Sequence, residues 1–494
     1  MKKILCIITL AALCAALLCG CGDTVIGGPA EGGSGPGVTP TPQSGATRVV
    51  FDGSGAEITG GGASFSGGTL KISSPGSYTL SGTLESGSVL VDTGEVKGDV
   101  TITLAGADIS CPDGPAIRIE RAKNAFIVVE KDSFNRLCSG YEGMSVDENA
   151  NGAAIFSESD LDLLGEGSLE IYGWINNGIT CKDDLDIKGA NTTVVAAHNG
   201  VKGSESVEIS GGSITVNAGN DGIKATSVKK EGKGFVSVTG GVIGVVCGGD
   251  GISAESYLSV TGGSIAVSAT GDPAAASCKG VKAKTGLTIS GGVLTLDSSD
   301  HSIRCAADIE ISGDATLMLR STEGKCISAG GALTISGGRI DAESADDCVA
   351  SKSSVVISGG ELRILSGADG IKASDKTTGE GTIEILGGEI TVSAFSDPID
   401  AKSFARISGG SFSGVGSSKT VKGFAADSAQ RSLVFNTSGA ANSSAELRAE
   451  SGGEVIFTVE ARCGYNVAIV SVPGLAPGSY TLSCGTIVSR ASVD

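Results

Sequence analysis

Residues 209–225 read ISGGSITVNAGNDGIKA, and variants of this stretch recur along most of the chain. The first element, Ile-Ser-Gly-Gly or a close variant, also begins at positions 289, 335, 357 and 407. The second element, Gly-Ile or Gly-Val, occurs at 178, 200, 222, 251, 280 and 370, and its aliphatic residue is kept at Ile155, Ile303, Ile327, Val349 and Ile399. Successive aliphatic anchors are separated by 22 to 29 residues, most often by 22. A repeat of this length is typical of a solenoid.

Within one repeat the apolar residues alternate with Ser and Thr, as at Ile214 and Val216. Alternation is the period of a β-strand, and the Gly-Gly pair suits a turn. The repeat usually divides into two halves of 11 residues. Such coils predict stacked parallel sheets about 4.8 Å apart, whereas a propeller blade needs about 40–45 residues. We therefore predict an all-β parallel β-helix, and the general crossover preference makes it right-handed.

The two ends of the chain differ from the repeat. An apolar run follows Lys2 and Lys3 and ends at Cys21, which is the pattern of a lipoprotein signal peptide. We predict residues 1–20 as the signal, Cys21 as the lipidated residue and residues 21–47 as a flexible linker. An ordinary signal peptide without lipid is the alternative. The β-helix is expected over 48–412, and 413–494 should hold the last coils and a small β cap that covers the open end. Strands of this cap are predicted near 454–461, 466–472 and 479–483.

Composition and charge exclude several classes of protein. Glycine supplies 78 of 494 residues without a three-residue period, which excludes collagen. The net charge is −19 and becomes more negative once the signal leaves. Proteins that bind nucleic acids or anionic membrane surfaces are normally basic, so both classes are disfavoured. We expect an extracellular monomer that the lipid attaches to the bacterial cell membrane.

Three features together resemble the clostridial secreted carbohydrate-binding β-helix family. They are the related runs NDGIKA at 220–225 and ADGIKA at 368–373, the repeated Ile-Ser-Gly-Gly, and the run VPGLAPGSYT at 472–481. The resemblance covers residues 48–494. It implies a fold like that of pectate lyases and an association with calcium, cellulose and acidic sugars at the cell surface. The resemblance does not imply catalysis.

Stacking converts aligned positions into columns. The column two residues before the anchors reads Ala153, Asn177, Asn199, Asp221, Asp250, Lys279, His301, Lys325, Asp347, Asp369 and Asp397. Carboxylates one strand spacing apart repel each other, and one Ca²⁺ ion with oxygen ligands could bridge them. We predict calcium ligands at Asp221, Asp250, Asp347, Asp369 and Asp397. The alternative is that Asp-Gly and Asn-Gly simply form good turns.

The column just after the anchors is largely basic and should face outward, because it alternates with a buried residue. Its candidate polysaccharide-binding residues are Lys202, Lys224, Lys282, Arg304 and Lys372. They could pair with uronate carboxylates or neutralise the acidic column. Trp174 could stack on a sugar or pack under a loop. Inserted loops near 229–233, 271–273 and 374–376 could wall a groove.

These features predict a cell-surface protein that binds an acidic, polygalacturonate-like or cellulosic polysaccharide with help from calcium. A polysaccharide lyase acting on uronate polymers is one alternative, with Lys282 or Arg304 as the base beside a calcium ion. The only histidines are His198 and His301, and no Gly-His-Gly motif is present. A structural surface adhesin is the other alternative.

Ten cysteines remain outside the signal and the lipidation site. Disulfides are allowed in an extracellular protein. Cys326 and Cys348 occupy the same position in adjacent coils, which is within disulfide reach. Cys463 and Cys484 could link the C-terminal cap, and Cys181, like Cys305, is expected as a buried thiol.

Overall fold

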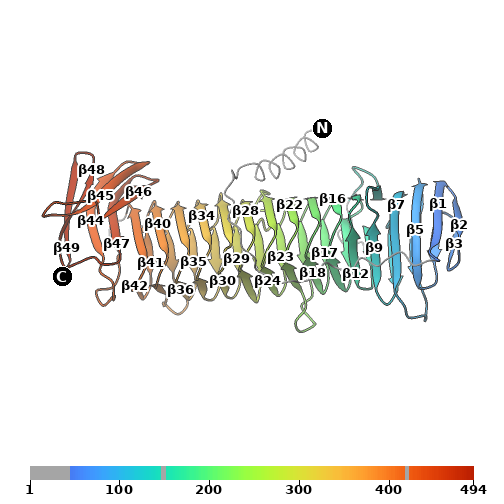
Figure 1. Ribbon diagram of the computed structural model, residues 1–494, viewed down its shortest axis with the longest axis horizontal. Coiled ribbons are helices and arrows are strands. Elements are labelled where there is room, and N and C mark those ends of the chain that lie inside the picture. Colours follow the sequence, from blue (N-terminus) through green and yellow to red (C-terminus); the bar gives the residue numbers. More distant parts are fainter. Residues whose placement is uncertain (1–44, 146–151, 418–421, 494) are drawn as a thin grey trace, which may run out of the picture. The chain divides into compact units, whose positions relative to one another are not determined.

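The structure of the protein is a computed structural model that describes residues 45–145, 152–417 and 422–493. The predicted signal, the lipidation site Cys21 and most of the linker lie outside these residues. Every regular element described is a β-strand (Figure 1). Among these residues no helix is long and apolar enough to cross a membrane. They form two compact units: unit 1 runs to Thr226 and includes Gly240–Cys247, and unit 2 holds Ser227–Thr239 and the chain from Gly248.

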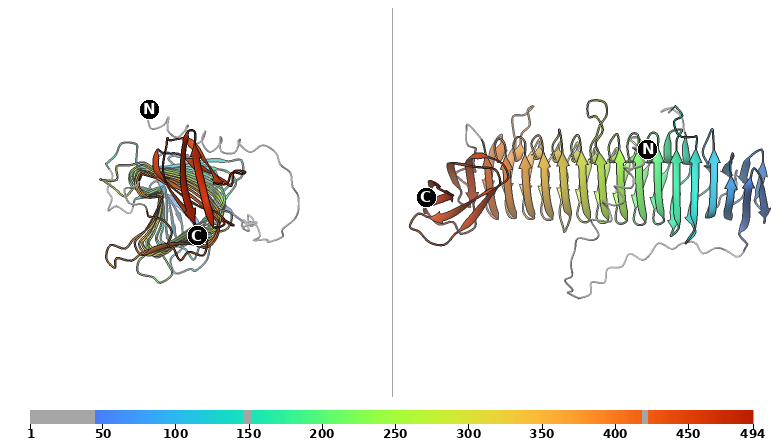
Figure 2. Two further views of the ribbon diagram at one scale, coloured as in Figure 1. Left: turned by 90° about the vertical axis from the view of Figure 1, so that its left-hand side faces the viewer. Right: turned by 90° about the horizontal axis from the view of Figure 1, so that it is seen from above.

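Each regular coil contributes three strands. In unit 1 one coil consists of β17 (Val201–Gly203), β18 (Ser206–Ile209) and β19 (Ser213–Ala218), and β20 (Ile223–Ala225) opens the next. Anchor strands pair in parallel from coil to coil, so that Val201 lies beside Ile223. The two predicted halves thus hold three strands, because the anchor half bends once more after Gly203. The predicted parallel β-helix is confirmed within each unit (Figure 2).

Unit 2 repeats the same pattern. Its anchor strands are β23 (Ile252–Ala254), β26 (Val281–Ala283), β29 (Ile303–Cys305), β32 (Ile327–Ala329), β35 (Val349–Ser351), β38 (Ile371–Ala373) and β41 (Ile399–Ala401). Each is followed by a short and a longer strand, as in β24 (Tyr257–Val260) and β25 (Ser264–Ala269). Inward aliphatic residues of all three strands are fully buried and form the core.

Glycine recurs at two places in a coil. The second residue of the Gly-Gly pair has a positive φ, for example 78° at Gly212 and 93° at Gly360, which favours glycine because it lacks a Cβ. The glycine directly before the anchor is favoured for a different reason, because its backbone packs against the core and leaves little room for a side chain. A Cβ at Gly200 would lie 2.2 Å from Cγ1 of Val216. Small residues therefore fill this position, and Cys326 and Cys348 are among them.

The ends of the described chain are antiparallel. At the N-terminal end β1 (Thr47–Gly53) pairs with β2 (Ala56–Thr59). The predicted cap strands near 454–461, 466–472 and 479–483 correspond to β46 (Phe457–Ala461), β47 (Tyr465–Ser471) and β48 (Gly478–Cys484).

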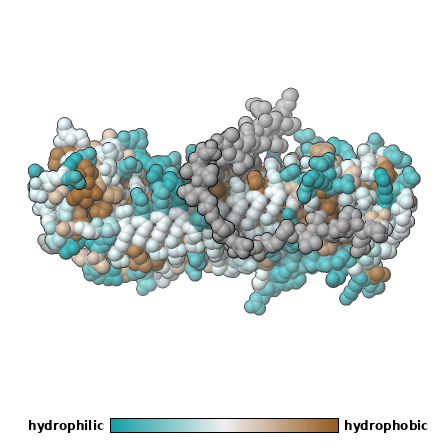
Figure 3. Space-filling model, in the orientation of Figure 1, coloured by the Kyte–Doolittle hydropathy of each residue, from teal (hydrophilic) through white to brown (hydrophobic). Residues whose placement is uncertain are grey.

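Three further strands of this end were not predicted, namely β44 (Leu433–Gly439), β45 (Ser443–Ala449) and β49 (Ile487–Val493). The expected boundary at 412 falls inside β43 (Ser411–Gly416), the last parallel strand, which pairs with β47 in the antiparallel sense. On the face seen in Figure 3, hydrophilic and neutral residues cover most of the described surface.

Candidate functional site

The residues two before each anchor, here called the inner column, accept backbone hydrogen bonds along the solenoid. In unit 2 the Asp347 Oδ1 atom accepts the N–H of Asp369 at 3.2 Å, and Asp369 Oδ1 accepts that of Asp397 at 3.1 Å. In unit 1 Asn177 Oδ1 accepts the N–H of Asn199 at 3.1 Å. These side chains are buried and satisfy a turn N–H of the next coil. This role is the turn-forming alternative stated for the column.

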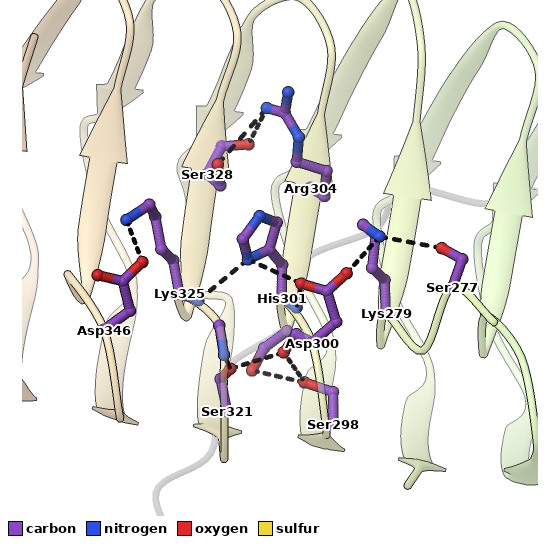
Figure 4. Close-up of polar contacts among 12 residues, drawn as sticks. Ser277, Lys279, Ser298, Asp300, His301, Arg304, Ser321, Lys325, Ser328 and Asp346 are labelled. Carbon is purple, nitrogen blue, oxygen red and sulfur yellow. Dashed lines mark hydrogen bonds and ion pairs between the residues drawn. The ribbon is translucent and has the colours of Figure 1, made fainter. Parts of the chain in front are cut away.

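Lysine interrupts the column and cannot accept a hydrogen bond. After Lys279, the N–H of His301 is instead accepted by Asp300 Oδ1 at 2.8 Å, and Asp300 also accepts the Lys279 ammonium at 2.5 Å (Figure 4). After Lys325, the carboxylate of Asp346 accepts the Lys325 ammonium at 2.5 Å and also the N–H of Asp347. Burial, the largest single effect, would raise the pKa of each carboxyl, but the lysine hydrogen bond, the backbone hydrogen bond and the nearby positive charges together outweigh it and lower the pKa.

His301 occupies the inner column as an acceptor. Its Nδ1 atom accepts the N–H of Lys325 at 3.0 Å, as the close-up shows (Figure 4). An imidazole can do this only when Nδ1 carries no proton. Burial, which is the largest cause, and the neighbouring cations Lys279, Arg304 and Lys325 lower the pKa of His301 to about 4. The ring is therefore neutral at physiological pH.

Three of the predicted calcium ligands, Asp250, Asp347 and Asp369, already have both carboxylate oxygens engaged; in Asp369, Oδ1 accepts the N–H of Asp397 and Oδ2 accepts the Lys372 ammonium. Asp250, 2% exposed, accepts Ser277 Oγ at 2.5 Å and the N–H of Lys279 at 3.0 Å on one oxygen, and Lys282 Nζ at 2.7 Å on the other. Asp347 lies between two ammonium groups: Lys325 Nζ is 2.6 Å from Oδ2 and Lys372 Nζ is 3.2 Å from Oδ1. Protein donors thus neutralise Asp250 and Asp347.

One acidic group of unit 2, at the end of the column, has carboxylates close enough together to share a divalent cation. Oxygens of Asp369, Asp397 and Asp400 lie within 4.8 Å of one another, and carboxylate oxygens are the ligands that calcium prefers. Burial, the largest single effect, would raise the pKa of Asp369, but the hydrogen bonds from Lys372, from the N–H of Asp397 and from Ser396, with the charge of Lys372, together outweigh burial and lower it. Lys422 binds Asp400 at 2.5 Å. The sequence analysis missed Asp400, although it continues the column after the anchors. Asp221 lies in unit 1, so its pairing with Asp250 stays a prediction.

The residues just after each anchor, here called the outer column, form an unbroken ladder in unit 2. Consecutive partners in neighbouring coils are Ser253, Lys282, Arg304, Ser328, Ala350, Lys372 and Asp400. Lys282 pairs with Asp250, and Arg304 Nη1 donates to the carbonyl of Ser328 at 3.0 Å. These contacts give both residues named for a lyase base a structural partner. Ser328 and Ala350 have small side chains, and this leaves a gap between the long side chains of Arg304 and Lys372.

A groove of about 530 Å³ lies over this gap in unit 2. Its floor includes Ser328 and Ala350, and the inserted loop that contains Ser374–Thr377 forms part of its lining, as expected for a loop leaving the solenoid. Four lysines and three aspartates line it: Lys325, Lys352, Lys372, Lys376, Asp346, Asp347 and Asp375. Lys325 and Lys372 are held by aspartates. In the described part of the chain Lys352 and Lys376 make no ion pair.

The outer column of unit 1 holds Lys202 beside Lys224. Burial, and then the charges of Lys182 and Lys224, lower the pKa of Lys202. Lys224 is paired with Asp221 at 2.5 Å, whereas Lys202 has no ion pair among the described residues. Trp174 stacks on Tyr172 with ring centroids 5.7 Å apart. Both rings are half-buried, and they belong to unit 1, whereas the residues of the groove belong to unit 2.

An acidic ladder in unit 1 was not anticipated. Asp162, Asp186 and Glu208 stand directly opposite one another in consecutive coils and line a cavity of about 340 Å³. The Lys188 ammonium bridges two of them, at 2.9 Å from Asp162 and 2.8 Å from Asp186. Aligning the segments that precede the Gly-Gly pairs places these three acids at one position of the repeat, so the ladder could have been predicted from the sequence.

The described cysteines are free thiols, which corrects both suggested disulfides. Cys326 and Cys348 are adjacent, as expected, but each thiol is buried and Cys326 Sγ donates to the carbonyl of Glu343 at 3.1 Å. Cys463 Sγ donates to the carbonyl of Ala394 at 3.4 Å and so faces the solenoid instead of Cys484. Cys181 and Cys305 are buried thiols, as predicted.

Comparison with known proteins gives a consistent result. A carbohydrate-binding domain-containing protein of Acetivibrio thermocellus is 34% identical over 152 residues, which are 30% of this chain and 53% of that protein. The chain therefore spans about half the length of this relative. The solved structure of a polysaccharide lyase-like protein from C. thermocellum, a gadolinium derivative, has 34% identity and a TM-score of 0.46, covering 50% of this chain and 99% of that one. Residues 66–324 and 302–456 match one family, so the chain belongs to the carbohydrate-binding domain-containing proteins.

Proposed function

We propose that the protein binds an acidic polysaccharide in the groove of unit 2. The observation that carries the proposal is the presence of two lysines without a described ion pair, Lys352 and Lys376, on a groove whose other lysines are neutralised. On a chain with net charge −19, such cations are suited to carboxylates of a ligand. Family membership supports a carbohydrate as that ligand.

The shape of the groove fits a chain molecule that follows the solenoid axis. From Arg304 to Lys372 the outer column crosses three coil steps, which is about 14 Å at the usual strand spacing. Small side chains over that length leave room for several sugar rings. The hydroxyl groups of Ser328 and Thr377 add hydrogen-bonding groups that suit sugar hydroxyls.

The test compares two double variants of equal charge change by calorimetry with oligogalacturonate. Lys352→Ala with Lys376→Ala is expected to weaken binding at least tenfold. The control, Lys229→Ala with Lys402→Ala, removes two lysines of unit 2 outside the groove lining and should bind like the wild type. Binding should also weaken as salt rises. Equal affinities for the two double variants, or a wild type that does not bind, would overturn the proposal.

Calcium is proposed at Asp369, Asp397 and Asp400, because their carboxylate oxygens lie close together. When bound there, calcium would supply positive charge next to the groove residue Lys372, which already binds Asp369 at 2.8 Å. Calcium should raise the melting temperature of the wild type and have no effect on Asp397→Asn with Asp400→Asn. Asp314→Asn, an exposed change in the same unit, is the control. A shift of equal size in all three proteins would exclude this group as the ligand.

Attachment to the cell surface through Cys21 stays part of the proposal. A lipid there, followed by the linker, would hold the solenoid outside the membrane and within reach of extracellular polysaccharide. Metabolic labelling with a fatty acid should mark the wild type and leave Cys21→Ser unlabelled.

A further inference from the structure

Most lysines of the outer column are held by aspartates of the inner column. The Lys372 ammonium lies 2.8 Å from Asp369, three residues before it, and 3.2 Å from Asp347, which belongs to the preceding coil. Lys224 of unit 1 lies 2.5 Å from Asp221, again three residues before it. Because each ammonium has a carboxylate within reach, the solenoid itself neutralises these lysines.

Lys202 of unit 1 has amides where those lysines have carboxylates. Asn199 stands three residues before it, and Asn177 is the inner-column residue of the preceding coil, whose strand β14 (Asn177–Cys181) pairs in register with β17. Asn177 Oδ1 accepts both the N–H and the Nδ2 of Asn199, and Asn199 Oδ1 accepts the N–H of Asp221 at 3.3 Å. Both amide oxygens are thus committed to the column. Among the described residues the Lys202 ammonium makes neither an ion pair nor a hydrogen bond.

The charges around Lys202 are positive. Lys224 is its register partner in the next coil, and Thr180 is its partner in the preceding coil, with Lys182 two residues further on. Burial, the largest cause, and then the charges of Lys182 and Lys224 lower the pKa of Lys202. More of this amine is therefore uncharged at neutral pH than in an ordinary lysine, and an uncharged amine is a nucleophile.

A hydroxyl group beside Lys202 has a hydrogen to donate. Thr180 is 3% exposed, and its Oγ1 atom accepts Nδ2 of Asn177 at 3.1 Å. A hydroxyl group is a donor as well as an acceptor, but the part of the chain that the structure describes offers the Thr180 hydroxyl no acceptor. Buried donors are normally paired. The level of Lys202 thus combines a nucleophilic amine, a buried donor and two further ammonium groups, and it lacks a carboxylate.

We propose that Lys202 is a carbamylation site, at which carbon dioxide becomes covalently bound to the lysine amine. The ammonium first releases a proton to water. The neutral Nζ then attacks the carbon of carbon dioxide, so that a C–N bond forms and the electron pair of one C=O π bond moves to oxygen. The nitrogen releases a second proton to water, which leaves the carbamate Lys–NH–COO⁻.

The carbamate supplies the carboxylate that this level of the column lacks. It replaces repulsion between Lys202 and its neighbours Lys182 and Lys224 by attraction, because a negative group now lies between positive ones. The Thr180 hydroxyl can donate to one of its oxygens. Lys372 has nothing to gain from the same reaction, since aspartates already hold its ammonium. It therefore serves as a control within the same molecule.

The first test traps the carbamate chemically. The intact protein is equilibrated with carbon dioxide in bicarbonate buffer and treated with triethyloxonium ion, which converts a carbamate into a stable ethyl carbamate. Peptide mass spectrometry should then find the adduct on Lys202 and not on Lys372. An unmodified Lys202, or equal modification of the two lysines, would overturn the proposal. This comparison needs no variant, so it does not depend on whether a variant folds.

Asn199→Asp tests the cause of the reactivity. It gives Lys202 a carboxylate three residues earlier, which is the arrangement in which Asp221 holds Lys224, and it keeps an acceptor for the column. The adduct should be lost although the lysine is retained. Asn191→Asp adds the same charge at the exposed first position of β16 (Asn191–Ala196) and should leave the adduct unchanged. Full modification of Lys202 in Asn199→Asp would overturn the proposal. A melting temperature that bicarbonate raises without any adduct would also overturn it, because that result indicates a non-covalent anion.

Discussion

The Nδ1 atom of His301 accepts the backbone N–H of Lys325 at 3.0 Å, at the column position where Asp347 and Asp369 use a carboxylate oxygen. A neutral imidazole thus replaces an acid between Lys279 and Lys325, which belong to the coils on either side of the coil of His301. Each of these lysines has its own acid one coil further on, Asp300 and Asp346. The column keeps its hydrogen bonds and changes its charge.

This relationship makes stability depend on pH. The pKa of His301 is lowered to about 4 in the folded protein, against about 6.5 in an unfolded chain. The unfolded state therefore binds more protons between these values, so the stability gained is complete above about pH 6.5 and is lost as pH falls toward 4. His301→Asn keeps a hydrogen-bond acceptor and should remove this pH-dependent part of the stability, which is at most about 3 kcal/mol. Melting curves of the two proteins from pH 7 to 4 should diverge, and parallel curves would contradict the assignment.

Asp250 is expected to be among the costliest single positions of the inner column. Asp250→Ala leaves the N–H of Lys279 and the Lys282 ammonium without their partner and should lower the free energy of unfolding by about 2–4 kcal/mol. Asp250→Asn keeps an acceptor and should cost less. Denaturant titration of both variants, alone and with Lys282→Met, measures the coupling. No coupling between positions 250 and 282 would exclude the ion pair as a stabilising contact.

Two glycine substitutions should have opposite effects on stability. A Cβ at Gly200 would lie 2.2 Å from Val216 Cγ1 and 2.6 Å from the carbonyl oxygen of Gly222, so Gly200→Ala must displace the core and should cost about 1–3 kcal/mol. At Gly286 a Cβ meets nothing, and Gly286→Ala should stabilise by about 0.4–1 kcal/mol because the unfolded chain loses freedom. Thermal denaturation of the pair checks this, and a destabilised Gly286→Ala would contradict the open space at this position.

The sequence predicts the register of this fold well, because one residue of each 22-residue period must be small and one must be aliphatic. Gly200 and Val201 show both constraints. The positions of Lys372 and Arg304 on one ladder followed from counting alone. The third strand of each coil did not follow, because the bend after Gly203 carries no Gly-Gly signal.

The chemistry of the columns was harder to predict than their register. The bond from Lys325 to Asp346 joins residues 21 apart, so it joins two different columns and is invisible when one column is read at a time. The rings of Phe235 and Tyr257 stack although 22 residues separate them in the chain, and the sequence around either residue does not indicate this contact. The contrast between Lys352 and Lys372 also depended on the structure, because Lys372 is held by Asp369 whereas Lys352 makes no ion pair among the described residues.

The cysteine pair of unit 2 gives the last prediction. Cys326 and Cys348 are fully buried, and burial raises the pKa of Cys348 well above its ordinary value, so little reactive thiolate forms. Iodoacetamide should therefore leave both residues unmodified in the native protein and modify both after denaturation without a reductant. Cys484, which is half-exposed, serves as the control that should react in the native state. A peptide in which positions 326 and 348 are cross-linked, recovered without reductant, would contradict the free thiols and restore the disulfide that the spacing of the coils permits.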